Sequence, residues 1–271
     1  MTKRFAIIIE SGNVTGQEDL PGARKDASNW EAFLKSNAGG AWRPDEIVVL
    51  HKPKSVDVSI LNIIHKTEYV FLVFSGHGEE VFDRTTRQYS TRVCLNEKEL
   101  SVDVKNLAPS RFGTAIFDCC RGVDNGLGSV LMMNEFARGG RGTLSFGMFS
   151  AKEAVDHGTI ESRKLFNATE EDCRQIFMTE LAAKQSNPTV RMYSCSKNEG
   201  AGEDPSAGGF YTTLLINGAE KWFEAQKMSR IYGVYSTKDA HDYAVEAMRA
   251  RNPQQHPEYT PCEQSYPFAV G

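Results

Sequence analysis

Strands that alternate with helices along this chain of 271 residues predict an α/β protein, a three-layer α/β/α sandwich around a mostly parallel central sheet. Short β-branched runs recur at residues 5–10, 46–50 and 69–74. Segments with apolar residues three and four positions apart lie between them, as in amphipathic helices. The chain is also long enough to bury one large core. We therefore expect a single domain.

The first part of the chain supplies the regular elements of this prediction. Residues 5–10 (FAIIIE) predict a buried strand, and residues 26–36 a helix with Trp30 on its apolar face. A second strand at 46–50 (EIVVL) and a second helix at 56–64 follow. The run 69–74 (YVFLVF) is uniformly apolar, which is typical of a strand covered on both faces. Residues 114–118 (TAIFD) predict a fourth strand.

The second part is less regular up to Pro188 and then resumes the pattern. A helix at 170–184 is expected, with Thr169 as its cap. A fifth strand at 189–195 (TVRMYSC) follows, then helices at 210–223 and 237–251. A proline-rich, extended tail ends the chain. Ligands of such sheets bind beyond the carboxyl ends of the strands.

Charge and cysteine content indicate the cellular compartment and limit the classes of binding partner. The chain carries 31 basic and 35 acidic residues, so no global field favours nucleic acid or an anionic membrane. No apolar run is long enough to cross a bilayer. The cysteines form no CxxC pair, so neither zinc nor a redox motif is indicated. We expect a reducing, cytoplasmic setting in which thiols stay free. The six cysteines are Cys94, Cys119, Cys120, Cys173, Cys195 and Cys262.

The first chemical motif is Ser75-Gly-His77-Gly78, directly after the third predicted strand. A histidine between two glycines is held on a tight turn, where its ring can point into a cleft. Gly78 allows close approach of the backbone, and its N–H is a candidate oxyanion donor. Taken alone, the motif also fits a loop histidine that the backbone satisfies.

The second motif is Asp118-Cys119-Cys120-Arg121-Gly122, at the end of the fourth predicted strand. Side chains alternate along a strand, so Asp118 and Cys120 face one cleft and Cys119 the opposite layer. A thiolate is a strong nucleophile, and a neighbouring histidine can accept its proton. For Cys119 a buried, inert thiol is the better interpretation.

Together the motifs resemble the caspase and metacaspase clan of cysteine peptidases. The clan's cysteine lies in a Q-A-C-R-G-like segment with a histidine roughly 50 residues upstream, and here D-C-C-R-G follows His77 by about 40. Residues 20–27, 193–215 and 252–268 are also similar to bacterial caspase-like domains. The resemblance implies one catalytic domain: 1–122 like a large subunit, 123–187 a variable inter-subunit region, and 188–271 like a small subunit.

The resemblance also implies roles for individual residues. Cys120 is the expected nucleophile and His77 the proton shuttle, and the N–H groups of Gly78 and Cys120 form the oxyanion hole. A backbone carbonyl could orient the imidazole. No metal or organic cofactor takes part, and no spacing of acidic residues resembles a calcium loop. The expected substrate-binding residues are Asp118, Ser194, Cys195 and Ser196.

Asp118 suggests which residue precedes the cut. Caspases bind aspartate partly through an arginine that Leu20 replaces here, and a carboxylate two residues before the nucleophile attracts Arg or Lys. The hypothesis is cleavage of polypeptides after a basic residue. Lys197 either points to solvent or neutralises Asp118.

Three further interpretations stay open. Arg138 and Arg141 lie in a glycine-rich segment that suits processing by the chain itself or by an upstream protease, but an ordinary surface loop fits equally well. A catalytically silent scaffold or binding module is the main alternative to an enzyme. A nucleotide site at residues 11–22 is disfavoured because its glycines match neither GxGxxG nor a P-loop.

Overall fold

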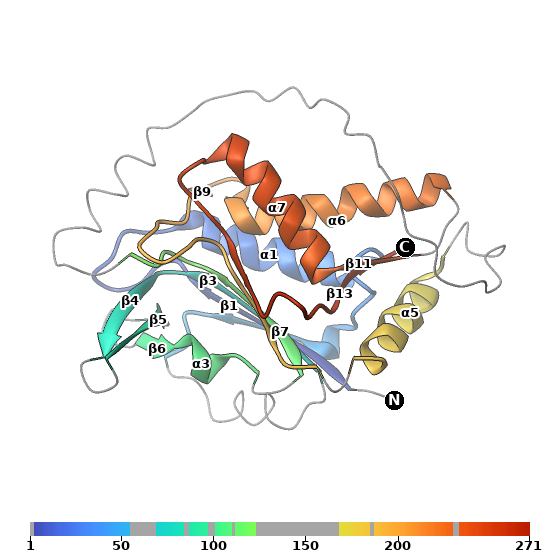
Figure 1. Ribbon diagram of the computed structural model, residues 1–271. Coiled ribbons are helices and arrows are strands. Elements are labelled where there is room, and N and C mark those ends of the chain that lie inside the picture. Colours follow the sequence, from blue (N-terminus) through green and yellow to red (C-terminus); the bar gives the residue numbers. More distant parts are fainter. Residues whose placement is uncertain are drawn as a thin grey trace.

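A six-stranded, mostly parallel sheet forms the centre of the molecule (Figure 1). The computed structural model describes residues 3–54, 69–83, 87–96, 101–109, 112–122, 168–184, 187–229 and 233–271. The strand order is β12-β8-β7-β3-β1-β2, and all neighbours are parallel except β12, which runs antiparallel to β8. These strands are β1 (Arg4–Ser11), β2 (Ile47–His51), β3 (Tyr69–Gly76), β7 (Gly113–Asp118), β8 (Val190–Tyr193) and β12 (Glu258–Thr260). The predicted fold class is confirmed.

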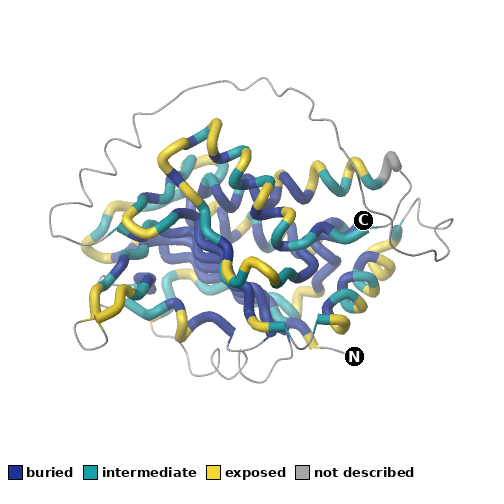
Figure 2. Tube along the Cα trace, in the orientation of Figure 1, coloured by how far each residue is buried: buried dark blue, intermediate teal, exposed yellow. Residues whose placement is uncertain are grey.

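The period-two alternation of the central strands divides the core between the two faces of the sheet. In β7, Ile116 packs into one apolar cluster while Ala115 and Phe117 pack into the other. β3 is buried along its whole length, as its uniformly apolar sequence predicts. Figure 2 shows the same pattern, with buried strands inside and exposed residues on the outer surfaces. Cys119 continues the Phe117 side of β7, so its thiol is buried as expected.

One face of the sheet carries the long helices and a short antiparallel pair of strands. Helix α1 contributes Trp30 and Phe33 to this core, where both rings contact Phe268. The capping box of α5 joins Thr169 to Asp172, as the sequence predicts for the Thr169 cap. These elements are α1 (Pro21–Lys35), α5 (Glu170–Ala182), α6 (Phe210–Ser229), α7 (Thr237–Arg251), β11 (Val234–Ser236) and β13 (Pro267–Val270).

The opposite face is covered differently. In the described part of the chain it carries a short helix and a separate three-stranded antiparallel sheet, β4-β5-β6, which the sequence analysis did not predict. These elements are β4 (Gly78–Asp83), β5 (Gln88–Cys94), β6 (Ser101–Asp103) and α3 (Val104–Leu107). β4 begins directly after His77, so the polypeptide passes from β3 through the histidine into this small sheet. The predicted helix at 56–64 and the segment 123–167 lie outside the described residues.

Several predicted bounds were wrong for identifiable reasons. α1 begins at Pro21 and not near residue 26, because proline is well tolerated at the first helical position, where no N–H is needed. α6 continues to Ser229, and β8 ends at Tyr193. Beyond β8, the Ser194 hydroxyl accepts a bond from the Cys119 N–H at 3.1 Å, so the chain turns toward the end of β7. The tail contains β12 and β13. A further short pair, β9 (Glu203–Asp204) and β10 (Gly208–Gly209), precedes α6.

Candidate active site

The two predicted chemical motifs lie side by side at the carboxyl edge of the sheet. β3 and β7 are parallel neighbours in which Ser75 is paired with Asp118. His77 and Cys120 each lie two residues beyond that pair, so the strand register brings both to the same edge. The approach is close, because a Cβ on Gly78 would lie 2.8 Å from the Cys120 carbonyl oxygen. Only glycine fits at this crossing point.

A backbone carbonyl orients the His77 imidazole. Nε2 lies 2.8 Å from the Glu18 carbonyl oxygen, which can only accept, so this nitrogen donates. Burial lowers the pKa of His77, and the carbonyls of Glu18 and Gly12 oppose that shift by favouring the protonated ring. A neutral imidazole that is held in place and still able to gain a proton suits a general base.

The Cys120 thiol lies against the backbone of Ala201. The Ala201 N–H donates to Sγ at 3.3 Å, and the Ala201 carbonyl oxygen lies 3.9 Å from it. Burial raises the pKa of Cys120, and the nearby carboxylates of Asp118 and Glu203 raise it further. The thiol therefore stays protonated in this arrangement and needs a base to become a nucleophile.

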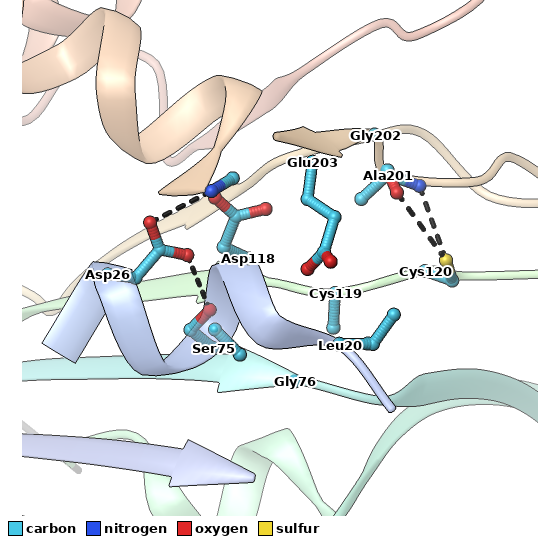
Figure 3. Close-up of a pocket in the computed structure, with 12 residues that line it drawn as sticks. Leu20, Asp26, Ser75, Gly76, Asp118, Cys119, Cys120, Ala201, Gly202 and Glu203 are labelled. Carbon is cyan, nitrogen blue, oxygen red and sulfur yellow. Dashed lines mark hydrogen bonds between the residues drawn. The ribbon is translucent and has the colours of Figure 1, made fainter. Parts of the chain in front are cut away.

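A small cavity opens beside Cys120, and its polar lining is acidic (Figure 3). The Asp118 carboxylate accepts bonds from the N–H and hydroxyl of Thr212, at 3.0 and 2.8 Å. The Asp26 carboxylate accepts bonds from Gly209 N–H at 2.9 Å and from the Ser75 hydroxyl at 2.6 Å. The cavity is lined by Leu20, Ala23, Asp26, Ser75, Gly76, Asp118, Cys119, Cys120, Ala201, Gly202, Glu203 and Gly209.

Burial shifts all three carboxyl groups of the cavity in the same direction. It raises the pKa of Asp26, and the negative charge of Asp118 raises it further. Burial also raises the pKa values of Asp118 and of Glu203. The Glu203 carboxylate accepts a bond from the Gly22 N–H at 3.3 Å. The cavity thus gathers three acids, and none of the described residues that line it is Lys, Arg or His.

Two of these acids were not predicted as site residues. Asp26 was used only to mark a helix, yet it lies on the buried face of α1 beside Ala23 and Ala27. A carboxylate on the apolar face of an amphipathic helix is a usable signal, because unpaired acids are rarely buried. Glu203 could not be placed from sequence, since the course of the loop after β8 decides where it points.

Other predicted residues lie elsewhere. Ser194 and Cys195 are fully buried, and their side chains contact the Cys119 carbonyl at 3.2 and 3.3 Å. The Ser196 hydroxyl donates to the His256 carbonyl. None of the three is among the described residues that line the cavity, although the Ser194 side chain interacts with Asp118, which does; their role in substrate binding stays a prediction.

Leu20 and Lys197, the two residues that depart from the family pattern, lie in different places relative to the cavity. Leu20 does line the cavity, in the place where a basic residue would favour aspartate. Lys197 is exposed and does not line it. Arg138 and Arg141 lie outside the described residues. Within the described part of the chain, no three His, Cys, Asp or Glu side chains are grouped to hold a metal ion, and no helix is long and apolar enough to cross a membrane.

Comparisons with known proteins identify the family and the fold. The caspase domain family matches residues 3–265. Among solved structures, the chain is similar to caspase-1 from Spodoptera frugiperda, with a TM-score of 0.53, 10% identity, and coverage of 96% of this chain and 86% of that chain. At that identity the likeness shows the fold alone. A search of curated proteins gave no match. Because the family match spans nearly the whole chain, the protein belongs to the caspase family of cysteine peptidases.

Proposed function

We propose that this protein is an endopeptidase that cuts polypeptides after Arg or Lys through a His77–Cys120 dyad. The observation that carries the specificity is the cavity beside Cys120, which gathers the carboxyl groups of Asp26, Asp118 and Glu203. A buried cluster of acids repels an acidic side chain and gains from a cation that pairs with it. An arginine guanidinium carries five donors in a planar fork, which can serve several carboxylates at once.

The same residues support a two-step mechanism. Nδ1 of His77, the ring nitrogen that does not bond Glu18, takes the proton of the Cys120 thiol. The thiolate then attacks the backbone carbonyl carbon of the substrate's Arg or Lys residue. The N–H groups of Gly78 and Cys120 stabilise the oxyanion. The C–N bond breaks as the imidazolium gives its proton to the leaving amine. Water then attacks the thioester and releases the acid, with His77 again as base.

The described state is closed to such a substrate. The cavity has a volume of about 30 Å³, enough for one or two water molecules and too small for an arginine side chain. The Ala201–Glu203 segment forms part of its wall: the Ala201 N–H donates to Cys120 Sγ, and the Glu203 carboxylate accepts from the Gly22 N–H. We therefore propose a zymogen-like state, which cleavage in the inter-subunit region near Arg138 and Arg141, by the chain itself or another protease, would open.

The free thiols support a reducing compartment. The thiols nearest the site, those of Cys119, Cys120 and Cys195, form no disulfide. A catalytic thiolate survives best where disulfides do not form, so we propose a cytoplasmic location. Epitope-tagged protein should remain in the cytosolic fraction of the source cells, and recovery from a secreted fraction would contradict this placement.

The decisive experiment compares the purified chain with its Cys120→Ala variant on reporter peptides that carry Arg, Lys, Asp or norleucine before the reporter group. We expect turnover of Arg and Lys peptides by the wild type only, measured with and without calcium. Turnover of Asp peptides would overturn the specificity and keep the dyad.

Silence of the wild type would direct the test to activation. Limited trypsin treatment that cuts near Arg138–Arg141 should then produce activity in the wild type and not in Cys120→Ala. Silence after such cleavage would favour the alternative, a catalytically inactive scaffold.

A further inference from the structure

A buried ion cluster lies directly beside the proposed nucleophile, centred on Arg121. Arg121 is 3% exposed, and its guanidinium contacts two carboxylates. Nε lies 3.0 Å from the Glu80 carboxylate, and Nη1 lies 2.5 Å from that of Glu258. Thr91 also donates to Glu80, and Arg121 Cζ lies 4.3 Å from the centroid of the Tyr193 ring. A buried guanidinium with this many partners has a single position.

The partners of Arg121 come from segments far apart in the sequence. Glu80 is on β4, which begins at the residue after His77, and Thr91 is on the neighbouring strand β5. Glu258 is on β12 at the edge of the main sheet. Arg121 Nη1 also donates to the carbonyl of Cys195, just after β8, at 3.1 Å. One side chain therefore ties the segment that carries His77 to the segment that carries Cys120.

The backbone around Arg121 is held as well. Its N–H donates to the Glu199 carbonyl at 2.9 Å, and its own carbonyl accepts from Asn198 N–H at 2.8 Å. Glu80 N–H donates to the Gly122 carbonyl at 3.0 Å. These bonds fix the peptide that follows Cys120 against both β4 and the loop leading to Ala201, which lines the cavity.

We infer that Arg121 and Glu80 are positioning residues for the dyad: their ion pair sets the distance between the His77 imidazole and the Cys120 thiol. This inference rests on the proposed function. It extends that function, because neither residue lines the cavity or reaches the substrate. Catalysis is sensitive to such placement, since a displacement of about 1 Å can cost roughly a hundredfold in rate.

The chain provides a matched control for a merely structural role. Arg4, Glu46 and Arg174 form a second, partly buried ion cluster at the amino-terminal end of β1, on the edge of the sheet opposite the site. Glu46→Gln removes a carboxylate from the cluster at Arg4, just as Glu80→Gln removes one from the cluster at Arg121. Glu258→Gln removes the charge of the second carboxylate that contacts Arg121. The Glu258 side chain is 41% exposed, so its loss should affect kcat less than the loss of Glu80.

The experiment measures kcat and KM on an Arg reporter peptide, melting temperature, and the rate at which iodoacetamide alkylates Cys120, located by peptide mapping. For Glu80→Gln and Arg121→Lys we expect kcat to fall about tenfold or more with KM within about threefold, and alkylation at pH 7 to slow in parallel. For Glu46→Gln we expect a lower melting temperature with kcat and alkylation within about twofold of wild type.

Two results would overturn the inference. The first is an alkylation rate in Glu80→Gln equal to that of the wild type. The second is an equal loss of kcat in Glu46→Gln, since general destabilisation would then explain both variants. Alkylation needs no peptide turnover, so a wild type that cuts no peptide would count against the proposed function and leave this test intact. If Arg121→Lys does not fold, Glu80→Gln and Thr91→Val carry the comparison.

Discussion

At the scale of single residues, Asp26 and Asp118 are an unfavourable pair for the fold. A Cβ placed on Gly209 would lie 2.4 Å from an Asp118 oxygen and 3.0 Å from an Asp26 oxygen, so both carboxylates converge on one point. Each is nearly inaccessible to solvent. Like charges buried together oppose folding, and such pairs are found at sites where a ligand supplies the opposite charge.

Replacing one of these acids should remove the preference for basic substrates. We expect Asp118→Asn to lower kcat/KM on Arg peptides by roughly 10- to 150-fold, the loss of one hydrogen bond between charged groups. The norleucine peptide should be much less affected. Glu220→Gln, an exposed change of the same charge on α6, is the control. Equal losses on the Arg and norleucine peptides would show that Asp118 does not contact the substrate side chain.

The raised pKa values of Asp26, Asp118 and Glu203 predict a pH-dependent selectivity. As pH falls through these values the carboxylates gain protons and lose their attraction for a cation. The ratio of kcat/KM for Arg over norleucine should therefore fall between pH 8 and pH 5. Because the same dyad cuts both peptides, its own titration affects both values of kcat/KM equally and cancels in the ratio. A ratio that does not change with pH would contradict the acidic pocket.

The same shift has a consequence for stability. Burial raises the folded-state pKa of Asp26, so the folded form is favoured while the carboxyl is protonated and loses that advantage as pH rises through the raised value. Asn at this position keeps an acceptor for Gly209 N–H and carries no charge. We expect Asp26→Asn to melt at a higher temperature than wild type at pH 8, with the difference shrinking toward pH 5. A constant difference would mean that Asp26 is not charged in the folded state.

At the scale of elements, the turn from β3 into β4 decides how closely His77 approaches Cys120. Gly78 crosses the end of β7 so tightly that a Cβ would lie 2.6 Å from the Cys119 sulfur. We expect Gly78→Ala to cost about 1–3 kcal/mol in the free energy of unfolding, because the core must shift to admit the methyl group. Peptide turnover should fall more than stability explains. Urea denaturation and kcat on the same preparation check both, and unchanged turnover would show that the close crossing at Gly78 does not control the placement of the dyad.

At the scale of the whole molecule, the two halves of the chain form one body. β8 and β12 from the second half extend the sheet that β1, β3 and β7 begin. The final strand, β13, returns under α1, where Phe268 contacts Trp30, Phe33 and Phe71. The carboxyl-terminal strand is therefore part of the main core, far along the sequence from the helix that it supports.

This arrangement predicts that the tail is required for stability. We expect Phe268→Ala to destabilise the fold by about 3–5 kcal/mol, because Phe268 is fully buried and leaves a cavity among aromatic rings. Differential scanning calorimetry of the full-length variant measures the loss. A change below about 1 kcal/mol would show that β13 is peripheral to the folded core.

The order of the parallel strands β1, β2, β3, β7 and β8 and of the helices α1, α5, α6 and α7 could be predicted from the sequence, together with the two motifs and the side of β7 on which Cys119 lies. Periodicity is local, so it survives without knowledge of the fold: the alternation from Thr114 to Cys120 was enough to separate Cys119 from Cys120. The His77 and Cys120 motifs could be located because each ends an apolar strand, and parallel strands end at one edge. The small sheet β4-β5-β6 was missed because its strands are rich in polar residues (GEEVFD, QYSTRVC and SVD) and contain no apolar run.

Only the tertiary structure decided which side chains share the site. Asp26 meets Asp118 because α1 packs across the ends of β3 and β7, and Glu203 reaches Gly22 because the loop after β8 folds back over the cavity. Arg121 meets Glu80 and Glu258 in the same way, through three elements distant in sequence. Contacts of this kind depend on how elements pack, and hydrophobic periodicity specifies which face of an element is buried but not which partner it meets.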